Sequence, residues 1–169
     1  MKTLSARAGW RIPVGTVLEV GASGSAGAQD AQPSDSVLHW HYGFDVHGEW
    51  SDVVFAAEFV RGHAEGETEP GGPACNLAPC IDYRGAYGQV GYRWTNWLEP
   101  YARVDWRHAL HRSGASFVYI SNLMRATVGA RLELDPAVVL KAEYVWNQEL
   151  GRIPSFPNDV LVSSLVVSY

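Results

Sequence analysis

The stretch Met124-Arg125-Ala126-Thr127-Val128-Gly129-Ala130-Arg131-Leu132-Glu133-Leu134 decides the fold, because apolar and polar residues alternate through it without a break. Met, Ala, Val or Leu stands at each even position, and Arg, Thr, Gly or Glu stands at each odd position. A period of two places the two sets on opposite faces of a β-strand. The alternation resumes in residues 138–147, after the turn residues 135–137, so the two segments predict a β-hairpin.

The same alternation recurs along the chain and predicts an all-β protein. With the hairpin and the terminal run from Val160 to Tyr169 it gives about nine strands of roughly ten residues, the length that a tilted strand needs to cross a bilayer. The other strands are expected at residues 4–10, 16–21, 38–47, 53–60, 86–94 and 102–107. Seven Trp, eight Tyr and 17 Gly with few Lys suit strands and tight turns better than helices.

Length and charge narrow the classes of protein. The 169 residues fit one domain, and we expect a single β-barrel domain over residues 1–169. Thirteen Lys and Arg against eighteen Asp and Glu give a formal charge of −5, which argues against a nucleic-acid partner on a basic face. The sequence contains no run of eighteen consecutive apolar residues, so it predicts no transmembrane helix. Residues 1–7 lack the apolar core of a signal peptide, so we expect either no export or a missing start.

Short and long connections take turns between the expected strands. The short ones are residues 11–13, 48–51, 95–97 and 135–137. The long ones, rich in Gly, Ser, Pro and charge, are residues 23–36, 62–83, 110–122 and 148–158. Outer-membrane barrels have short periplasmic turns and long extracellular loops, whereas a soluble sandwich has no reason to keep this order. The connections therefore favour an antiparallel up-and-down transmembrane β-barrel.

The tryptophans indicate which face of the strands meets lipid. They fall near the two ends of the strands, and none lies at mid-strand. The group at the short turns is Trp10, Trp50, Trp94 and Trp97, and the group near the long loops is Trp40, Trp106 and Trp146. Trp and Tyr gather at membrane interfaces, because the ring is apolar and its N–H or O–H needs water. We therefore expect outer-membrane lipid on the apolar face and a lumen on the opposite face.

Every expected strand but the last places an ionisable side chain on the polar face. These candidate pore-lining residues are Arg7, Glu19, Asp45, Glu58, Arg93, Arg103, Asp105, Arg107, Arg125, Arg131, Glu133, Lys141 and Glu143. In a membrane barrel they would pair across strands, and a ring of Arg would favour anions where a ring of acids would favour cations. On a soluble barrel the same residues would form the solvated outer face.

Three C-terminal motifs carry a resemblance to a known family. They are Arg-Ala-Thr-Val-Gly-Ala at 125–130, Leu-Lys-Ala-Glu-Tyr at 140–144, and a last strand that follows Asn158-Asp159 and ends in Tyr169. In these last sixty or so residues the chain resembles a Gram-negative outer-membrane porin of the phosphate-selective O/P type or a related family. Lys2 and Lys141 are the only lysines, so no lysine-rich phosphate ladder is expected.

The resemblance and the strand pattern together imply a passive channel for small polar or ionic solutes in the outer membrane. They imply no enzymatic activity. The last strand and Tyr169 resemble the signal read by the barrel-insertion machinery, and porins of this kind associate as homo-trimers, which makes a trimer an expectation by analogy.

The odd strand count leaves alternatives open. Bacterial single-chain barrels have an even number of strands, and an aqueous channel needs about sixteen to eighteen. We expect this chain to be the C-terminal part of a larger barrel. One alternative is a closed barrel of eight strands with a structural or adhesive role, in which residues 4–10 form no strand. Another is a soluble ligand-binding barrel with Leu38, Tyr42, Phe55 and Phe59 inside.

Cysteine and histidine residues are the other candidates for chemistry. Cys75 and Cys80 lie in the longest loop, where an oxidising exterior favours a disulfide over two free thiols or half of a metal site. His39 and His41 point the same way on one strand, with Asp45 and His47 further along that face. Such a cluster could bind a metal or activate water, but pore-lining residues are the simpler interpretation. We expect no catalytic residue, metal site or cofactor.

Overall fold

Nine β-strands make up most of the part of the chain that the structure describes. The computed structural model describes residues 3–13, 17–28, 38–66, 69–72, 75–77, 80–113, 116–151 and 157–167. The strands are β1 (Leu4–Pro13), β2 (Val17–Ala28), β3 (Leu38–Trp50), β4 (Val53–Ala64), β5 (Cys80–Tyr92), β6 (Leu98–Ser113), β7 (Ser116–Asp135), β8 (Val138–Glu149) and β9 (Val160–Val167). The alternating residues of these segments favour strands, because a half-buried strand needs one apolar and one polar face.

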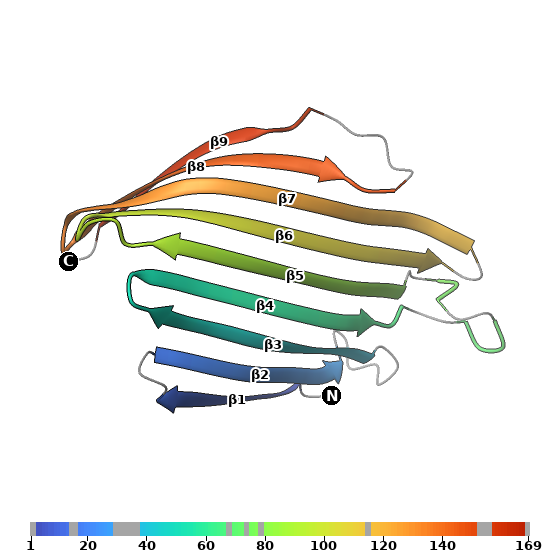
Figure 1. The fold of residues 1–169 in the computed structure, drawn as a ribbon. Helices are drawn as coiled ribbons and strands as arrows, with labels where there is room; N and C mark the ends of the chain where they lie inside the picture. Colours follow the sequence, from blue (N-terminus) through green and yellow to red (C-terminus); the bar gives the residue numbers. More distant parts are fainter. Residues whose placement is uncertain are drawn as a thin grey trace.

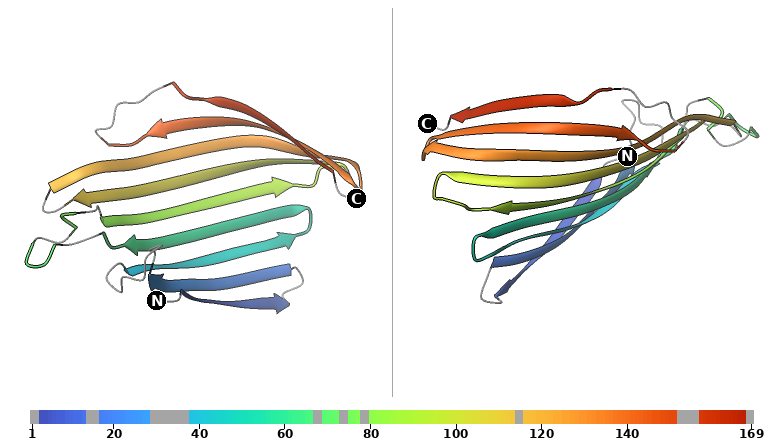
Figure 2. Two further views of the ribbon diagram at one scale, coloured as in Figure 1. Left: turned by 180° about the vertical axis from the view of Figure 1, so that it is seen from behind. Right: turned by 45° about the horizontal axis from the view of Figure 1, so that its top comes forward.

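The strands form one antiparallel sheet in the order of the sequence, from β1 to β9. Figure 1 shows this sheet as a single curved layer with β1 at one edge and β9 at the other, and Figure 2 shows the same curvature in two further views. The predicted all-β, antiparallel, up-and-down fold is confirmed. The alternative with eight strands is wrong, because residues 4–13 form β1 and pair with β2 throughout.

The sheet is stabilised without a packed interior. Among the described residues no large side chain is fully buried, and the few buried apolar residues include Ala64 and Tyr101. Ladder hydrogen bonds and contacts between neighbouring strands on each face therefore hold the layer together. In the part of the chain that the structure describes, no helix is long and apolar enough to span a membrane.

The connections follow the predicted order except between β6 and β7. The long loop predicted for residues 110–122 is wrong, because β6 continues to Ser113 and β7 begins at Ser116, with a register shift between His111 and Arg112. Ser and Gly suggested a loop there, but ladder hydrogen bonds need only backbone groups, and the run 117–120 (Phe-Val-Tyr-Ile) has high strand propensity. Backbone ladder hydrogen bonds likewise extend β2 to Ala28, into the predicted connection 23–36.

Short and long connections otherwise lie at opposite ends of the sheet (Figure 1). At one end β3 joins β4 through Ser51 and Asp52, and Ser51 has the left-handed φ of 54° that this tight turn requires. At the same end β7 joins β8 through residues 136–137. At the other end the chain runs from Ala64 to Cys80 before β5 begins. The sheet therefore has a short-turn end and a long-loop end.

Candidate pore-lining face

One face of the sheet carries the predicted pore-lining residues. Directly paired residues on neighbouring antiparallel strands point to the same face, so the register groups side chains into rows. One row runs across six strands through Asp45, Glu58, Tyr87, Asp105, Arg125 and Asn147. The register brings twelve of the thirteen predicted residues to this side, here called the polar face: Arg7, Glu19, Asp45, Glu58, Arg103, Asp105, Arg107, Arg125, Arg131, Glu133, Lys141 and Glu143.

Side chains on the polar face reach across whole strands. Arg7 of β1 donates a hydrogen bond to Asp45 of β3 at 2.9 Å, over the intervening β2. Tyr101 of β6 donates to Glu143 of β8 at 2.5 Å, over β7. Neighbouring strands lie about 4.8 Å apart, so each contact bridges roughly 10 Å of sheet. Such contacts need long side chains and a sheet that curves towards this face.

Glycines on the polar face make room for these crossings. Gly129 of β7 pairs with Tyr101, and a Cβ there would lie 2.7 Å from the Tyr101 hydroxyl oxygen. At Gly62 of β4 a Cβ would lie 2.3 Å from the ring of Tyr83. Each tyrosine ring therefore lies over the backbone of its neighbouring strand, where any side chain would exclude it.

Most charges of the polar face are paired. The Lys141 ammonium lies 3.0 Å from the Glu143 carboxylate, and the Arg131 guanidinium lies 2.5 Å from the Glu133 carboxylate. Arg103 forms a salt bridge with Asp105. All six side chains are at least one fifth exposed, so each pair adds little to the free energy of folding. The pairing keeps the face strongly polar but close to neutral.

The remaining predicted residue, Arg93, lies just beyond the end of β5. Its guanidinium donates two hydrogen bonds to the Glu49 carboxylate, at 2.6 and 3.0 Å, so it reaches the polar face at the short-turn end. The hydrogen bonds to Glu49 are the main reason that the pKa of Arg93 is raised above its ordinary value. The two-pronged geometry fixes the Arg93 side chain beside the turns.

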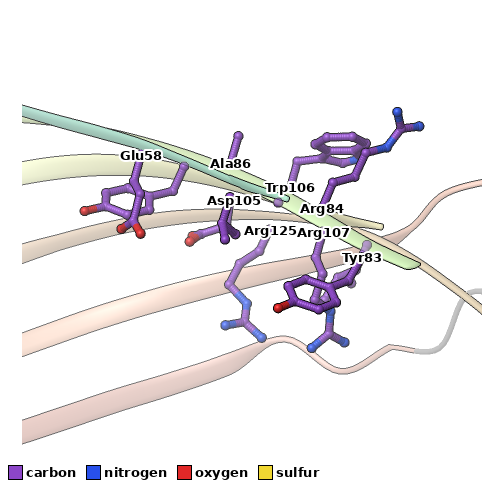
Figure 3. Close-up of a pocket in the computed structure, with 12 residues that line it drawn as sticks. Glu58, Tyr83, Arg84, Ala86, Asp105, Trp106, Arg107 and Arg125 are labelled. Atoms are coloured by element: carbon purple, nitrogen blue, oxygen red, sulfur yellow. The ribbon is translucent and has the colours of Figure 1, made fainter. Parts of the chain in front are cut away.

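Three of the predicted pore-lining residues have no ionic partner among the described residues. Arg107 donates to the Ser121 hydroxyl at 3.3 Å, and Arg125 donates to the Asn147 side-chain oxygen at 2.9 Å. Glu58 takes part in no ion pair within the described part of the chain. Figure 3 shows Arg107, Arg125 and Tyr83 pointing to one side of the sheet, and Arg84 and Trp106 pointing to the other. All five line a hollow of about 450 Å³.

The opposite side, here called the apolar face, is rich in exposed large apolar side chains. Trp10, Trp50 and Phe44 are 74%, 71% and 56% exposed. Leu38 and Tyr42, which a soluble barrel would bury, are also exposed. The structure therefore gives no support to the soluble alternative.

The disulfide joins Cys75, in the connection between β4 and β5, to Cys80, the first residue of β5. Cys75 and Cys80 are bonded, with their Cα atoms 5.5 Å apart. The Cys80 sulfur also accepts a hydrogen bond from the Gly66 amide at 3.1 Å. The bridge therefore ties the start of β5 to its preceding connection.

The histidines of β3 have polar partners that sequence reasoning missed. His41 lies 3.1 Å from the Ser25 hydroxyl, and His39 lies 3.0 Å from the Tyr83 hydroxyl. The described residues contain no group of three His, Cys, Asp or Glu side chains that could hold a metal ion. These partners come from neighbouring or next-neighbouring strands, so only the register could have revealed them.

Comparison with known proteins supports the fold. No protein-family model matches the sequence, and no curated protein sequence matches it either. Among solved structures, the chain is similar to OmpT (in-vitro folded), an outer membrane protein of Vibrio cholerae, with a TM-score of 0.59 and 11% identity. The match covers 87% of this chain but 46% of the other, so the chain spans about half of that protein. The nine strands thus share the antiparallel all-β fold of an outer membrane protein.

Proposed function

We propose that the chain forms part of the wall of a β-barrel in the outer membrane of a Gram-negative bacterium, and that this barrel is a passive channel for small polar or ionic solutes. The observation that carries the proposal is the separation of charged and apolar side chains on opposite faces of one sheet that has no second layer. Transport needs no reaction step, so no catalytic residue, metal or cofactor enters the proposal.

The apolar face has the height of a bilayer core. Trp40 and Trp50 lie near opposite ends of β3, ten residues apart. At about 3.3 Å per residue they are separated by roughly 33 Å along the strand, or about 25 Å across a membrane if the strand tilts by about 40°. That height matches the lipid-facing band of outer-membrane barrels, which aromatic residues border on both sides.

The charges of the polar face argue against an arrangement in which this face meets lipid. Arg125 and Glu58, near the middle of their strands, would each be costly in hydrocarbon, whereas a water-filled lumen keeps them and Arg107 hydrated. In the proposed orientation the lumen holds paired charges and these three free ones. The width of the lumen limits solute size, and its free charges set the preference for anions or cations.

The two edges of the sheet support a barrel with further strands. In the described residues β1 and β9 are the outermost strands, and unpaired edge groups are not tolerated in lipid. The first and last of nine alternating strands run in the same direction, so joining them directly would create a parallel pair. An odd number of further strands allows antiparallel closure, and about sixteen to eighteen in total give an aqueous lumen.

Assembly partners form part of the same proposal. The resemblance of the C-terminal strand to porins suggests that the barrel-insertion machinery recognises it through Tyr169, which lies outside the described residues. The same resemblance suggests that three barrels associate in the outer membrane.

Planar bilayer recording of the full-length protein tests the channel. We expect stepwise, ohmic conductance in KCl, and a shift of ion selectivity towards cations in the double variant Arg107→Gln/Arg125→Gln, which removes two positive charges from the lumen. The matched control Arg61→Gln/Arg84→Gln removes two positive charges from the apolar face and should leave selectivity unchanged. Folded protein without conductance, or equal shifts in both double variants, would refute the proposal.

A further inference from the structure

A row of hydrogen-bonding side chains crosses the apolar face near its long-loop end. Tyr42, Arg61, Arg84, His108 and Asn122 are direct partners on the successive strands β3 to β7. The neighbouring row towards the short turns is Phe44, Phe59, Ala86, Trp106 and Met124. The change from apolar to polar therefore takes place between two adjacent rows. We call the row from Tyr42 to Asn122 the arginine row.

Two like charges face each other in the arginine row. Arg61 and Arg84 are directly paired across β4 and β5, an arrangement that is unfavourable unless an anion lies between or beside them. Neither arginine forms an ion pair within the described residues. The neighbouring carboxylate on this face belongs to Asp82, and it is bonded to the His63 ring at 2.7 Å. The protein itself supplies little to balance the two guanidinium groups.

Aromatic side chains hold the arginine row at the proposed membrane interface. The Arg84 guanidinium lies 5.2 Å from the centre of the Trp106 ring, and the Trp106 indole N–H donates to Asn122 at 3.1 Å. Figure 3 shows Arg84 and Trp106 on the same side of the sheet. At the β3 end of the row, Tyr42 stacks on Trp40 with their ring planes 3° apart. Tryptophan and tyrosine prefer the depth at which lipid headgroups lie.

We propose that Arg61 and Arg84 bind the phosphate group of an anionic lipid headgroup at the long-loop end of the barrel. The inference rests on the proposed function only in requiring that the apolar face meets lipid. Guanidinium groups bind phosphate through paired hydrogen bonds, and Tyr42 and His108 flank them in the same row with further hydrogen-bonding groups. The lipid chains of such a ligand would lie along the apolar rows below.

Native mass spectrometry of the full-length protein in detergent micelles tests the site, with phosphatidylglycerol and phosphatidylcholine as probes. We expect phosphatidylglycerol to be retained in preference to phosphatidylcholine. Arg61→Gln/Arg84→Gln should weaken phosphatidylglycerol binding roughly thirtyfold, about fivefold for each arginine near an anionic lipid surface. Arg61→Lys/Arg84→Lys keeps both charges and should retain most of the binding.

Two controls separate this site from its alternatives. Arg107→Gln/Arg125→Gln makes the same charge change on the polar face and should leave lipid binding unchanged. Glycerol 3-phosphate carries the same phosphate chemistry without lipid chains and should not compete at the concentrations at which the lipid binds. Unchanged lipid binding in Arg61→Gln/Arg84→Gln, an equal loss in the polar-face control, or competition by glycerol 3-phosphate would overturn the proposal.

Conductance distinguishes failure of this site from failure of the channel. If the protein conducts but Arg61→Gln/Arg84→Gln still binds phosphatidylglycerol normally, the lipid site is wrong and the channel stands. If the protein does not conduct but the same variant loses lipid selectively, the lipid site stands and the channel is wrong.

Discussion

Replacing Gly129 with alanine tests whether side chains that cross glycine backbones stabilise the polar face. The new Cβ would lie 2.7 Å from the Ala142 carbonyl oxygen and 2.7 Å from the Tyr101 hydroxyl oxygen. The carbonyl belongs to the backbone of β8, so it cannot move without disturbing the ladder. Tyr101, only 7% exposed, would have to leave its place and lose its 2.5 Å hydrogen bond to Glu143.

The expected cost has two parts. Overpacking of a well-packed site costs about 1–3 kcal/mol. Loss of a hydrogen bond to a charged group costs about 1.5–3 kcal/mol. We therefore expect Gly129→Ala to lower the free energy of unfolding by about 3 kcal/mol or more. Tyr101→Phe removes the hydrogen bond without the clash and should cost only the second part.

Urea unfolding of the detergent-folded protein, followed by tryptophan fluorescence, measures these changes. Gly88 of β5 supplies a matched control, because a Cβ there would meet no atom within 4 Å. Gly88→Ala should change the free energy of unfolding by less than about 0.5 kcal/mol. If Gly129→Ala and Gly88→Ala unfold at the same urea concentration with equal slopes, the polar-face crossings do not stabilise the sheet.

Two further predictions follow from the two faces and the disulfide. Val128→Arg places a charge at mid-strand on the apolar face and should reduce the free energy of folding into lipid vesicles by about 2–4 kcal/mol. Urea titration measures this cost. Ala56→Arg places the same charge on the polar face and should cost clearly less. An equal cost for both would contradict the assignment of the faces. Cys75→Ser opens a bridge with a sequence separation of 5 residues and should lower the free energy of unfolding by about 2 kcal/mol. Dithiothreitol should destabilise the native protein but not this variant, and a native protein that is insensitive to reduction would contradict the prediction.

Local sequence was enough to predict the strands and the face on which each side chain lies. Alternation between Met124 and Leu134 specifies a period of two, and the residues that it assigns to the polar side are on the polar face of the structure. Cys75 and Cys80 are only 5 residues apart in the sequence, so their disulfide could also be predicted locally. Local pattern failed at residues 110–122, because the serines there lie in strands that depend on pairing with the neighbouring strand, which a local pattern does not contain.

The contacts between strands were decided only by the tertiary structure. Sliding one strand by two residues keeps every side chain on its face and leaves the alternation unchanged, but it gives each residue a new partner. The sequence left Arg61 and Arg84 just outside the strands expected at residues 53–60 and 86–94, and only the structure extended β4 and β5 through them and placed them opposite each other. The same holds for the crossing from Tyr101 to Glu143, which needs Gly129 between them and a sheet that curves towards the polar face. Period is a property of a single strand, whereas register and curvature are properties of the whole sheet.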